Sequence, residues 1–200
     1  MAFIRAKTEI LVGENGNIPT DIVSFHGLTD KKEHVALVFK DGDKQAAPLV
    51  RLHSECLTGD VFNSSRCDCG DQLNETIKRL SAQGGILLYL RQEGRGIGLY
   101  NKLDTYVLQK KGMNTYEANT HLGFKEDERD FTVAEQMLKA LNISKISLIT
   151  NNPKKIAAFQ QSTVQIEEIV NTGVYEKLDN QHYLHTKRTR GGHIIKLKSK

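Results

Sequence analysis

The first fifty residues alternate between apolar and polar positions, which is the period of half-buried β-strands. Two such stretches, "TEILVG" and "DIVSFHG", flank the turn signal "ENGN". Two more, "HVALVFK" and "APLVRLH", flank "DGDKQA". Apolar runs joined by Gly-, Asn- and Asp-rich turns are typical of β-hairpins. The pattern therefore predicts a β-rich beginning built from two strand pairs.

From Asp71 the apolar period becomes that of a helix, which "QGG" ends near residue 83. The apolar positions of this helix are Leu73, Ile77 and Leu80. The short run "GILLYL" at 85–90 then predicts a buried strand. A second helix is expected over "GLYNKLDTYVLQKKG", with Gly112 as its C-terminal stop.

The second half of the chain continues to alternate between helices and strands. Thr132 and Glu135 form a capping-box pattern that predicts the start of a helix. A buried strand is expected at 145–150, then a helix capped by Asn152, then a last strand at 165–170.

A β-rich start followed by alternating strands and helices favours the α/β class. We expect a single domain with a mixed β-sheet, because no linker, repeat or low-complexity tract divides the sequence. The predicted boundaries are 1–180 for this domain and 181–200 for a C-terminal tail.

The net charge of +4 comes from the tail. After Asp179 there is no acidic residue, and without the tail's six Lys and Arg residues the chain has 22 basic against 24 acidic residues. These six are Lys187, Arg188, Arg190, Lys196, Lys198 and Lys200. Such a tail is most often a solvated end, but it can also be an arm over an anionic ligand, a partner subunit or nucleic acid.

Composition indicates a soluble protein, with 38% hydrophobic and 26% charged residues. Arg5, Lys7 and Glu9 interrupt the N-terminus, so it lacks the apolar core of a signal peptide. The longest apolar run is too short to span a bilayer. We therefore expect a cytoplasmic protein, whose thiols stay reduced.

All three cysteines, Cys56, Cys67 and Cys69, fall within fourteen residues. An odd number fits poorly with disulfides. Thiolates bind zinc, which takes four protein ligands in structural sites and three plus water in catalytic ones. A metal site is therefore the preferred interpretation, while redox chemistry and inert buried thiols stay open as alternatives.

A fourth protein ligand could come from a histidine. The candidates are His53, His121, His182, His185 and His193. The signature of zinc nucleobase deaminases is absent, because the pair here is C-x-C without a preceding proline.

Three further segments could bind an anionic ligand. Gly94, Gly96 and Gly98 lie between a strand and a helix, where free backbone N–H groups and Arg95 suit phosphate oxygens. Neither common nucleotide-binding glycine pattern matches, and a plain strand–helix turn is the alternative. "KEDERDF" is either a solvated turn or an acid–base pair, and "LITNNPKK" either caps a helix or ends a strand at a ligand site.

Taken together, several blocks in one order resemble GTP cyclohydrolase II, which opens the guanine ring of GTP in riboflavin synthesis. The blocks are "RLHSECLTGD", "RCDCG", "RQEGRGIGL", "YEAN", "LGFKEDERDF" and "LITNNPKK", from about residue 30 to residue 160. The chain looks like the stand-alone form, without the synthase domain that precedes this enzyme in many organisms.

The resemblance implies a set of site residues. Cys56, Cys67 and Cys69 would bind one zinc ion per subunit and leave a fourth position for water. Asp127 would accept a proton, Arg129 would act on the α-phosphate as a nucleophile or by its charge, and Tyr106 would help to complete the second hydrolysis. The implied GTP contacts are Arg51, Leu52, His53, Ser54, Glu55, Gln72, Glu93, Gly94, Arg95, Thr115, Thr150 and Lys155.

The resemblance also implies Mg²⁺ with the triphosphate, GTP as substrate and a homodimer, with neither nucleic acid nor membrane as a partner. The products would be formate, diphosphate and 2,5-diamino-6-(5-phosphoribosylamino)pyrimidin-4-one. Rival hypotheses are a member that stops at ring opening or regulates, and a nucleic-acid-binding module with structural zinc. The last is disfavoured because an aromatic content of 6% leaves little for base stacking.

Overall fold

The structure, a computed structural model, describes residues 1–195, which form two compact units. The chain passes repeatedly between them, so no single position separates one from the other. The sheet unit contains residues 1–53, 73–91 and 131–173. The cysteine unit contains residues 54–72, 92–130 and the chain from 174 onward.

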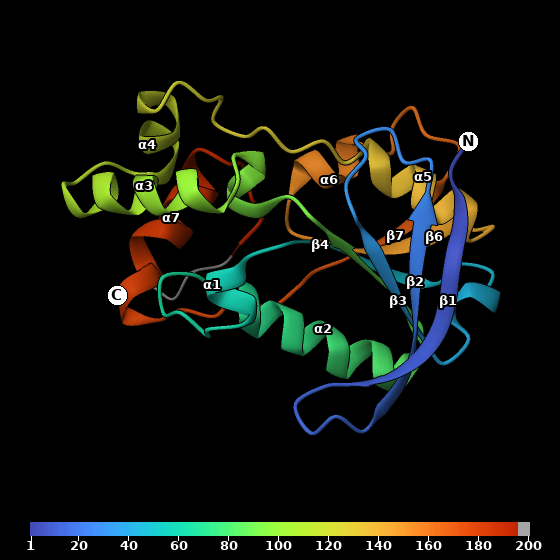
Figure 1. The fold of residues 1–200 in the computed structure, drawn as a ribbon. Coiled ribbons are helices and arrows are strands. Elements are labelled where there is room, and N and C mark those ends of the chain that lie inside the picture. The colour runs from blue at the N-terminus through green and yellow to red at the C-terminus, as the bar shows by residue number, and fades with distance from the viewer. Residues whose placement is uncertain (196–200) are drawn as a thin grey trace. The chain divides into compact units, whose positions relative to one another are not determined.

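The sheet unit is built on a seven-stranded mixed sheet (Figure 1). Its strand order is β1-β2-β3-β5-β4-β6-β7. The β1, β2, β3 and β5 strands pair antiparallel, whereas β4, β6 and β7 pair parallel. The strands are β1 Phe3–Val12, β2 Ile18–His26, β3 Val35–Phe39, β4 Leu49–Ser54, β5 Gly85–Leu90, β6 Lys145–Ile149 and β7 Gln165–Val170. The predicted α/β class with a mixed sheet is confirmed.

One of the two predicted strand pairs is wrong. The β1 and β2 strands form the first hairpin as expected. However, β3 and β4 are not neighbours, because β5 lies between them in the sheet. All but one residue of β5 are buried, so this strand gains more from a central position than from an edge.

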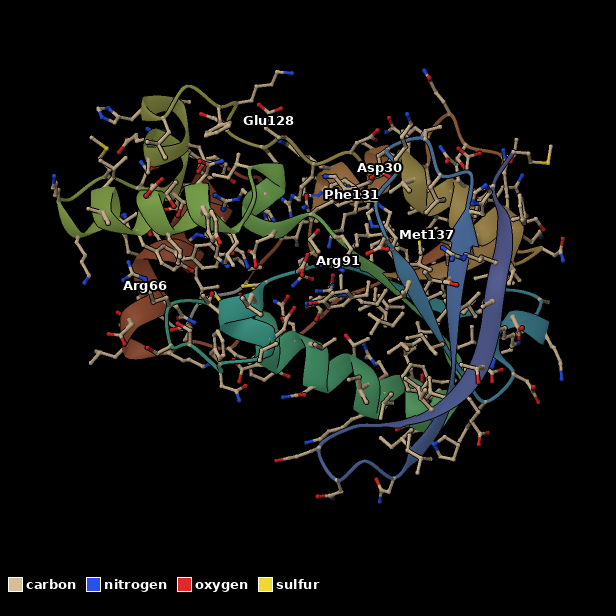
Figure 2. All side chains as sticks on the ribbon, viewed as in Figure 1. Asp30, Arg66, Arg91, Glu128, Phe131 and Met137 are labelled. Atoms are coloured by element: carbon tan, nitrogen blue, oxygen red, sulfur yellow. The ribbon has the colours of Figure 1, made fainter. Side chains whose placement is uncertain are left out.

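Helices cover both faces of the sheet (Figure 1). On one face, α5 (Thr132–Ala140) and α6 (Pro153–Ala157) pack over the larger core, where Met137 points toward the strands (Figure 2). On the other face, residues 73–83 of α2 (Cys69–Gln83) pack Leu80 against Phe39 and Leu87. The apolar periods in the sequence thus mark the buried faces correctly.

The start of α5 differs from its predicted capping box. The helix begins at Thr132, but Phe131 occupies the N-cap position. The Glu135 carboxylate instead accepts a hydrogen bond from the Thr163 backbone at 3.1 Å. For α6 the predicted cap is confirmed, since Asn152 Oδ1 accepts from the Lys154 N–H at 2.9 Å.

The cysteine unit consists mainly of short helices. They are α1 Leu57–Asp60, η2 Glu93–Gly96, α3 Leu99–Lys110, α4 Thr115–His121, η3 Leu178–Asn180 and α7 Gln181–Thr189, while η1 Gly42–Lys44 belongs to the sheet unit. The pattern predicted α3 but missed α4, although Asn114 and Glu117 form a complete capping box there.

The basic tail is ordered where the structure describes it. Residues 181–189 form α7, and Leu184 and Thr186 on this helix are buried. The side chain of Lys187 is only 14% exposed and pairs with Asp68. A solvated end is therefore wrong for this part of the tail, whereas Lys196, Lys198 and Lys200 lie outside the described residues. The predicted boundary at residue 180 stays a prediction.

Within residues 1–195, no helix is both long and apolar enough to cross a membrane.

Truncating a core side chain tests the packing of α5. Leu138 is fully buried, and Leu138→Ala should lower the free energy of unfolding by about 2–5 kcal/mol, because it removes apolar contacts and leaves a cavity. Leu178 is 89% exposed, so Leu178→Ala should change it by less than about 0.5 kcal/mol. Urea unfolding followed by circular dichroism measures both; equal effects would contradict the assigned core.

Candidate active site

The three cysteine sulfurs gather at one point of the cysteine unit. Their Sγ atoms lie within 4.8 Å of one another, and those of Cys56 and Cys67 are 3.7 Å apart. Cys56 comes directly before α1, while Cys69 opens α2. Gly59 packs directly against the cluster. A Cβ at this position would lie 2.8 Å from Cys67 Sγ and 3.2 Å from Cys56 Sγ, so only glycine leaves room for the sulfurs.

A buried ion pair borders the cluster. Lys102 on α3 donates to Glu93 Oε1 at 2.7 Å and to Cys56 Sγ at 3.2 Å. The other oxygen of Glu93 accepts from the Leu57 N–H at 2.6 Å. The side chains of Lys102 and Glu93 are only 10% and 9% exposed. The ammonium therefore neutralises a carboxylate while facing a sulfur.

The three thiols have different acidities because they contact one another. Hydrogen bonds from Cys67 and Cys69 lower the pKa of Cys56 well below its ordinary value, and the Lys102 charge lowers it further, against the effect of burial. The hydrogen bond with Cys56 raises the pKa of Cys67 to about 11. The pKa of Cys69 is also raised, by its bonds to the other two thiols and by burial. Because the three sulfurs lie so close together, ionisation of one thiol opposes ionisation of the other two.

Tyr106 lies beside this cluster on α3. Its hydroxyl is 3.2 Å from Thr58 Oγ1, which in turn lies 3.7 Å from Cys56 Sγ. The guanidinium of Arg66 stacks on the ring, 4.4 Å from its centroid, and Arg66 is labelled in Figure 2. Burial raises the pKa of Tyr106, so the phenol keeps its proton and can donate a hydrogen bond.

The glycine loop has an unusual backbone. Arg95 has a φ of 61°, a left-handed conformation that costs a non-glycine residue roughly 1–3 kcal/mol. Gly96 has a φ of 94°, and a Cβ there would lie 2.9 Å from the Glu128 backbone. The Arg95 guanidinium stacks on Tyr116, 4.4 Å from the ring centroid. The loop is thus held in a conformation that few residues other than glycine adopt readily.

Three buried polar atoms of the cysteine unit have no hydrogen-bond or ion-pair partner among residues 1–195. They are Ser54 Oγ, Gln92 Oε1 and Arg95 Nη1. A buried polar atom without a partner costs roughly 1–3 kcal/mol. Ser54 and Arg95 are among the residues for which the sequence predicted ligand contacts, whereas Gln92 is not.

Asp127 and Arg129 face each other. Arg129 donates from Nε to Oδ1 at 2.8 Å and from Nη2 to Oδ2 at 2.9 Å. Their side chains are 5% and 13% exposed, so a solvated turn is wrong for these two residues. Burial opposes the charge of Arg129, but the hydrogen bonds and charge of Asp127 outweigh it and raise the pKa of the guanidinium.

The sheet unit places its own candidates at the carboxyl ends of β4 and β6. Arg51 donates to the Ile149 carbonyl at 3.1 Å, and Lys155 donates to the Leu52 carbonyl at 2.6 Å. The parallel pairing of Arg51 with Ile149 brings these ends together. Thr150 at the end of β6 is buried, as are Arg51 and Lys155. Lys155 is therefore not the exposed lysine of a simple helix cap.

Comparison with known proteins identifies the family. The GTP cyclohydrolase II family model matches residues 8–171. A GTP cyclohydrolase-2 from Aliivibrio fischeri is 65% identical over 192 residues, 96% of each chain. One from Vibrio cholerae is 61% identical over 198 residues, which cover 98% of this chain and 100% of that one.

The chain belongs to the GTP cyclohydrolase II family.

The predicted enzyme class, a GTP cyclohydrolase II hydrolase of riboflavin biosynthesis, is confirmed. The family match begins at residue 8, earlier than the motifs indicated. A riboflavin biosynthesis protein RibBA from Bacillus cytotoxicus is 48% identical over 201 residues, which cover 98% of this chain but 49% of that protein. This chain therefore resembles about half of RibBA and nearly the full length of the GTP cyclohydrolase-2 relatives.

The two units hold the residues predicted for a GTP cyclohydrolase II site in separate sets. The sheet unit carries Arg51, Leu52, His53, Thr150 and Lys155. The cysteine unit carries the three cysteines, Tyr106, Asp127 and Arg129 with Ser54, Glu55, Gln72, Glu93, Gly94, Arg95 and Thr115. Thr115 opens α4, and His53 stacks on Tyr89 at a centroid distance of 5.6 Å.

Sequence reasoning missed Lys102, which touches both Glu93 and Cys56. It also missed Asp68, which lies between two of the cysteines and is 1% exposed. The position of Asp68 inside the C-x-C motif was a signal that could have been read. The sequence contained no such signal for Lys102, because a lysine on an amphipathic helix is usually a surface residue.

Replacing Lys102 should change the acidity of the cluster. In metal-free, reduced protein, Lys102→Met should move the first thiol ionisation to higher pH, because the ammonium that stabilises the Cys56 thiolate is gone. Thiolate ultraviolet absorbance against pH measures this shift. Lys110→Met, at the exposed end of the same helix, is the control and should leave the curve unchanged. Identical curves for both variants would show that Lys102 does not act on Cys56.

Proposed function

We propose that this chain hydrolyses GTP with a zinc ion held by Cys56, Cys67 and Cys69. The reaction opens the imidazole ring of guanine at C8, releases formate and diphosphate and leaves 2,5-diamino-6-(5-phosphoribosylamino)pyrimidin-4-one. The observation that carries the proposal is the sulfur cluster of a GTP cyclohydrolase II family member, bordered by Lys102, Glu93 and Tyr106.

The residues present fit zinc. Three sulfurs converge from two segments, and the missing side chain of Gly59 leaves room beside them. Thiolate is a preferred zinc ligand, and three protein ligands are typical of catalytic zinc. The histidines named as possible fourth ligands do not belong to the cluster, whose members within residues 1–195 are the three cysteines. When bound, zinc supplies a Lewis acid that activates water near neutral pH.

The chain's own residues carry the other roles. Tyr106 is assigned to the second hydrolysis, the release of formate, because its protonated hydroxyl lies beside the cluster through Thr58. Glu93 holds Lys102 and the segment after Cys56 in place. Asp127 is assigned as the proton acceptor.

Arg129 is assigned as a charge stabiliser of the α-phosphate. Its guanidinium is held bidentately by Asp127, which keeps it protonated and leaves no nitrogen lone pair for attack. Loss of diphosphate is then assisted by positive charge.

GTP contacts are assigned within each unit. In the sheet unit the cationic groups are Arg51 and Lys155, with Leu52, His53 and Thr150 beside them. In the cysteine unit Ser54 and Arg95 offer buried atoms without partners, together with Glu55, Gln72, Glu93, Gly94 and Thr115. Mg²⁺ is assigned to the triphosphate. The homodimer stays a prediction from the family.

The deciding experiment incubates the protein with GTP and Mg²⁺ and measures formate and diphosphate. Zinc-loaded wild type should release both, and Cys56→Ser should retain less than about 1% of the activity, since changes outside the ligand shell alone cost about 10–100-fold. Because the chain has no cysteine outside the cluster, the control is wild type stripped of metal and reloaded with zinc.

Each outcome of this experiment has a definite meaning. Absence of formate from zinc-loaded wild type would refute the proposal. Diphosphate without formate would assign a family member that stops at ring opening. Full activity of Cys56→Ser would show that Cys56 does not hold the metal.

A second experiment distinguishes the two roles of Arg129. With GTP labelled at the α-phosphorus, rapid quenching during turnover should trap no label on the protein, and Arg129→Ala should lower kcat by about 10²–10³-fold. Arg5→Ala, on the exposed edge strand, is the control. Covalent label that is lost in Arg129→Ala would instead establish attack by the guanidinium.

A further inference from the structure

The segment after residue 173 contacts the loop that carries two of the cysteines. Lys177 Nζ lies 2.6 Å from Asp71 Oδ2, and Ser65 donates to Asp179. Between these two contacts, Lys187 Nζ donates to Asp68 Oδ1 at 2.8 Å. The three contacts thus span Ser65 to Asp71, with Cys67 and Cys69 enclosed.

The contact at Asp68 is the most buried of the three. Its side chain is 1% exposed, and that of Lys187 is 14% exposed. The second oxygen of Asp68 accepts from Gln72 Nε2 at 2.7 Å. Both oxygens are therefore used, one by α7 and one by a residue assigned to GTP. Removing one partner of a buried ion pair leaves an uncompensated charge, so the loss of Lys187 should be costly for the loop that carries Asp68.

The same helix reaches the glycine loop. The ring of Tyr183 on α7 contacts two cations, with Lys187 Nζ 4.5 Å and Arg95 Cζ 5.8 Å from its centroid. The buried Leu184 anchors the helix, and Gly191 packs against the Tyr116 hydroxyl. The α7 helix thus contacts Arg95 directly and contacts Asp68, the hydrogen-bond partner of Gln72.

We propose that α7 is a positioning element of the active site and that Lys187 is its principal residue. By holding Asp68, Lys187 fixes the Cys67–Asp68–Cys69 loop and the side chain of Gln72. This role lies outside the family match, which ends at residue 171. It rests on the proposed function only in that the cluster is taken to hold zinc.

The test compares Lys187→Met with Arg188→Met. Both variants remove one positive charge from α7, but Arg188 is exposed. In metal-free protein, amide hydrogen exchange should become faster over residues 65–72 in Lys187→Met and stay unchanged over α5, which reports on the sheet unit. Arg188→Met should leave both regions as in wild type.

Zinc affinity, measured by competition with a chelator, provides the second readout. Lys187→Met should bind zinc about 10–100-fold more weakly, as expected when an outer-shell partner is lost. Lys187→Arg, which can still pair with Asp68, should recover most of the loss. With GTP, Lys187→Met should also raise KM, because Asp68, the hydrogen-bond partner of Gln72, is no longer fixed.

Equal exchange and equal zinc affinity in Lys187→Met and Arg188→Met would overturn the inference. If Lys187→Met is not recovered folded, Lys187→Gln, which keeps a donor without the charge, is judged by the same readouts. A wild type that binds no zinc would refute the proposed function, and the exchange experiment would still decide whether Lys187 holds the loop.

Discussion

The cysteine unit depends on one buried ammonium group. Lys102 binds Glu93 and Cys56, and Glu93 in turn accepts from the backbone N–H groups of Leu57 and Gly94. These bonds tie α3, the glycine loop and the start of α1 to the sulfur cluster. A buried carboxylate or thiolate without a counter-charge would be strongly unfavourable. The ion pair therefore lowers the cost of burying Glu93 and a Cys56 thiolate side by side.

The cysteine unit also contains a strained backbone and buried polar atoms without partners among residues 1–195. Arg95 has a left-handed backbone, and its carbonyl accepts from the Glu128 N–H at 2.9 Å, beside the close approach of Gly96 to Glu128. Arg95 Nη1 and Ser54 Oγ are buried without partners among the described residues. Strain and unpaired polar atoms cluster at functional sites more often than elsewhere. Ser54 and Arg95 are two of the residues that the family resemblance assigned to GTP, but Gln92, which also has a buried oxygen without a partner, is not.

Much of the fold could be predicted from apolar period, because each period reflects a buried face: α2, α3, β5, β6 and β7 lie where the pattern placed them. The prediction of the second hairpin failed because tertiary packing decides which strands become neighbours. The β5 strand, which is distant from β3 and β4 in sequence, lies between them in the sheet. For the site, the cysteines were readable from their ligand chemistry. Lys102 and Lys187 were not, because burial of a lysine is set by the partner that folding brings to it.

Two buried lysines balance the negative charge around the three cysteines. Lys102 and Lys110 share one helix, as do Lys187 and Arg188, yet within each pair only the first residue meets a buried carboxylate. With zinc bound as proposed, three thiolates and one divalent cation leave a single negative charge. Glu93 with Lys102 and Asp68 with Lys187 are then each neutral. Without the two lysines, the zinc–thiolate centre, Glu93 and Asp68 would together carry three unpaired negative charges in the protein interior. Burying charges without partners is strongly unfavourable. The two lysines, which both follow the cysteines in sequence, therefore permit two carboxylates to lie beside a thiolate zinc site, where they can hold the surrounding loops.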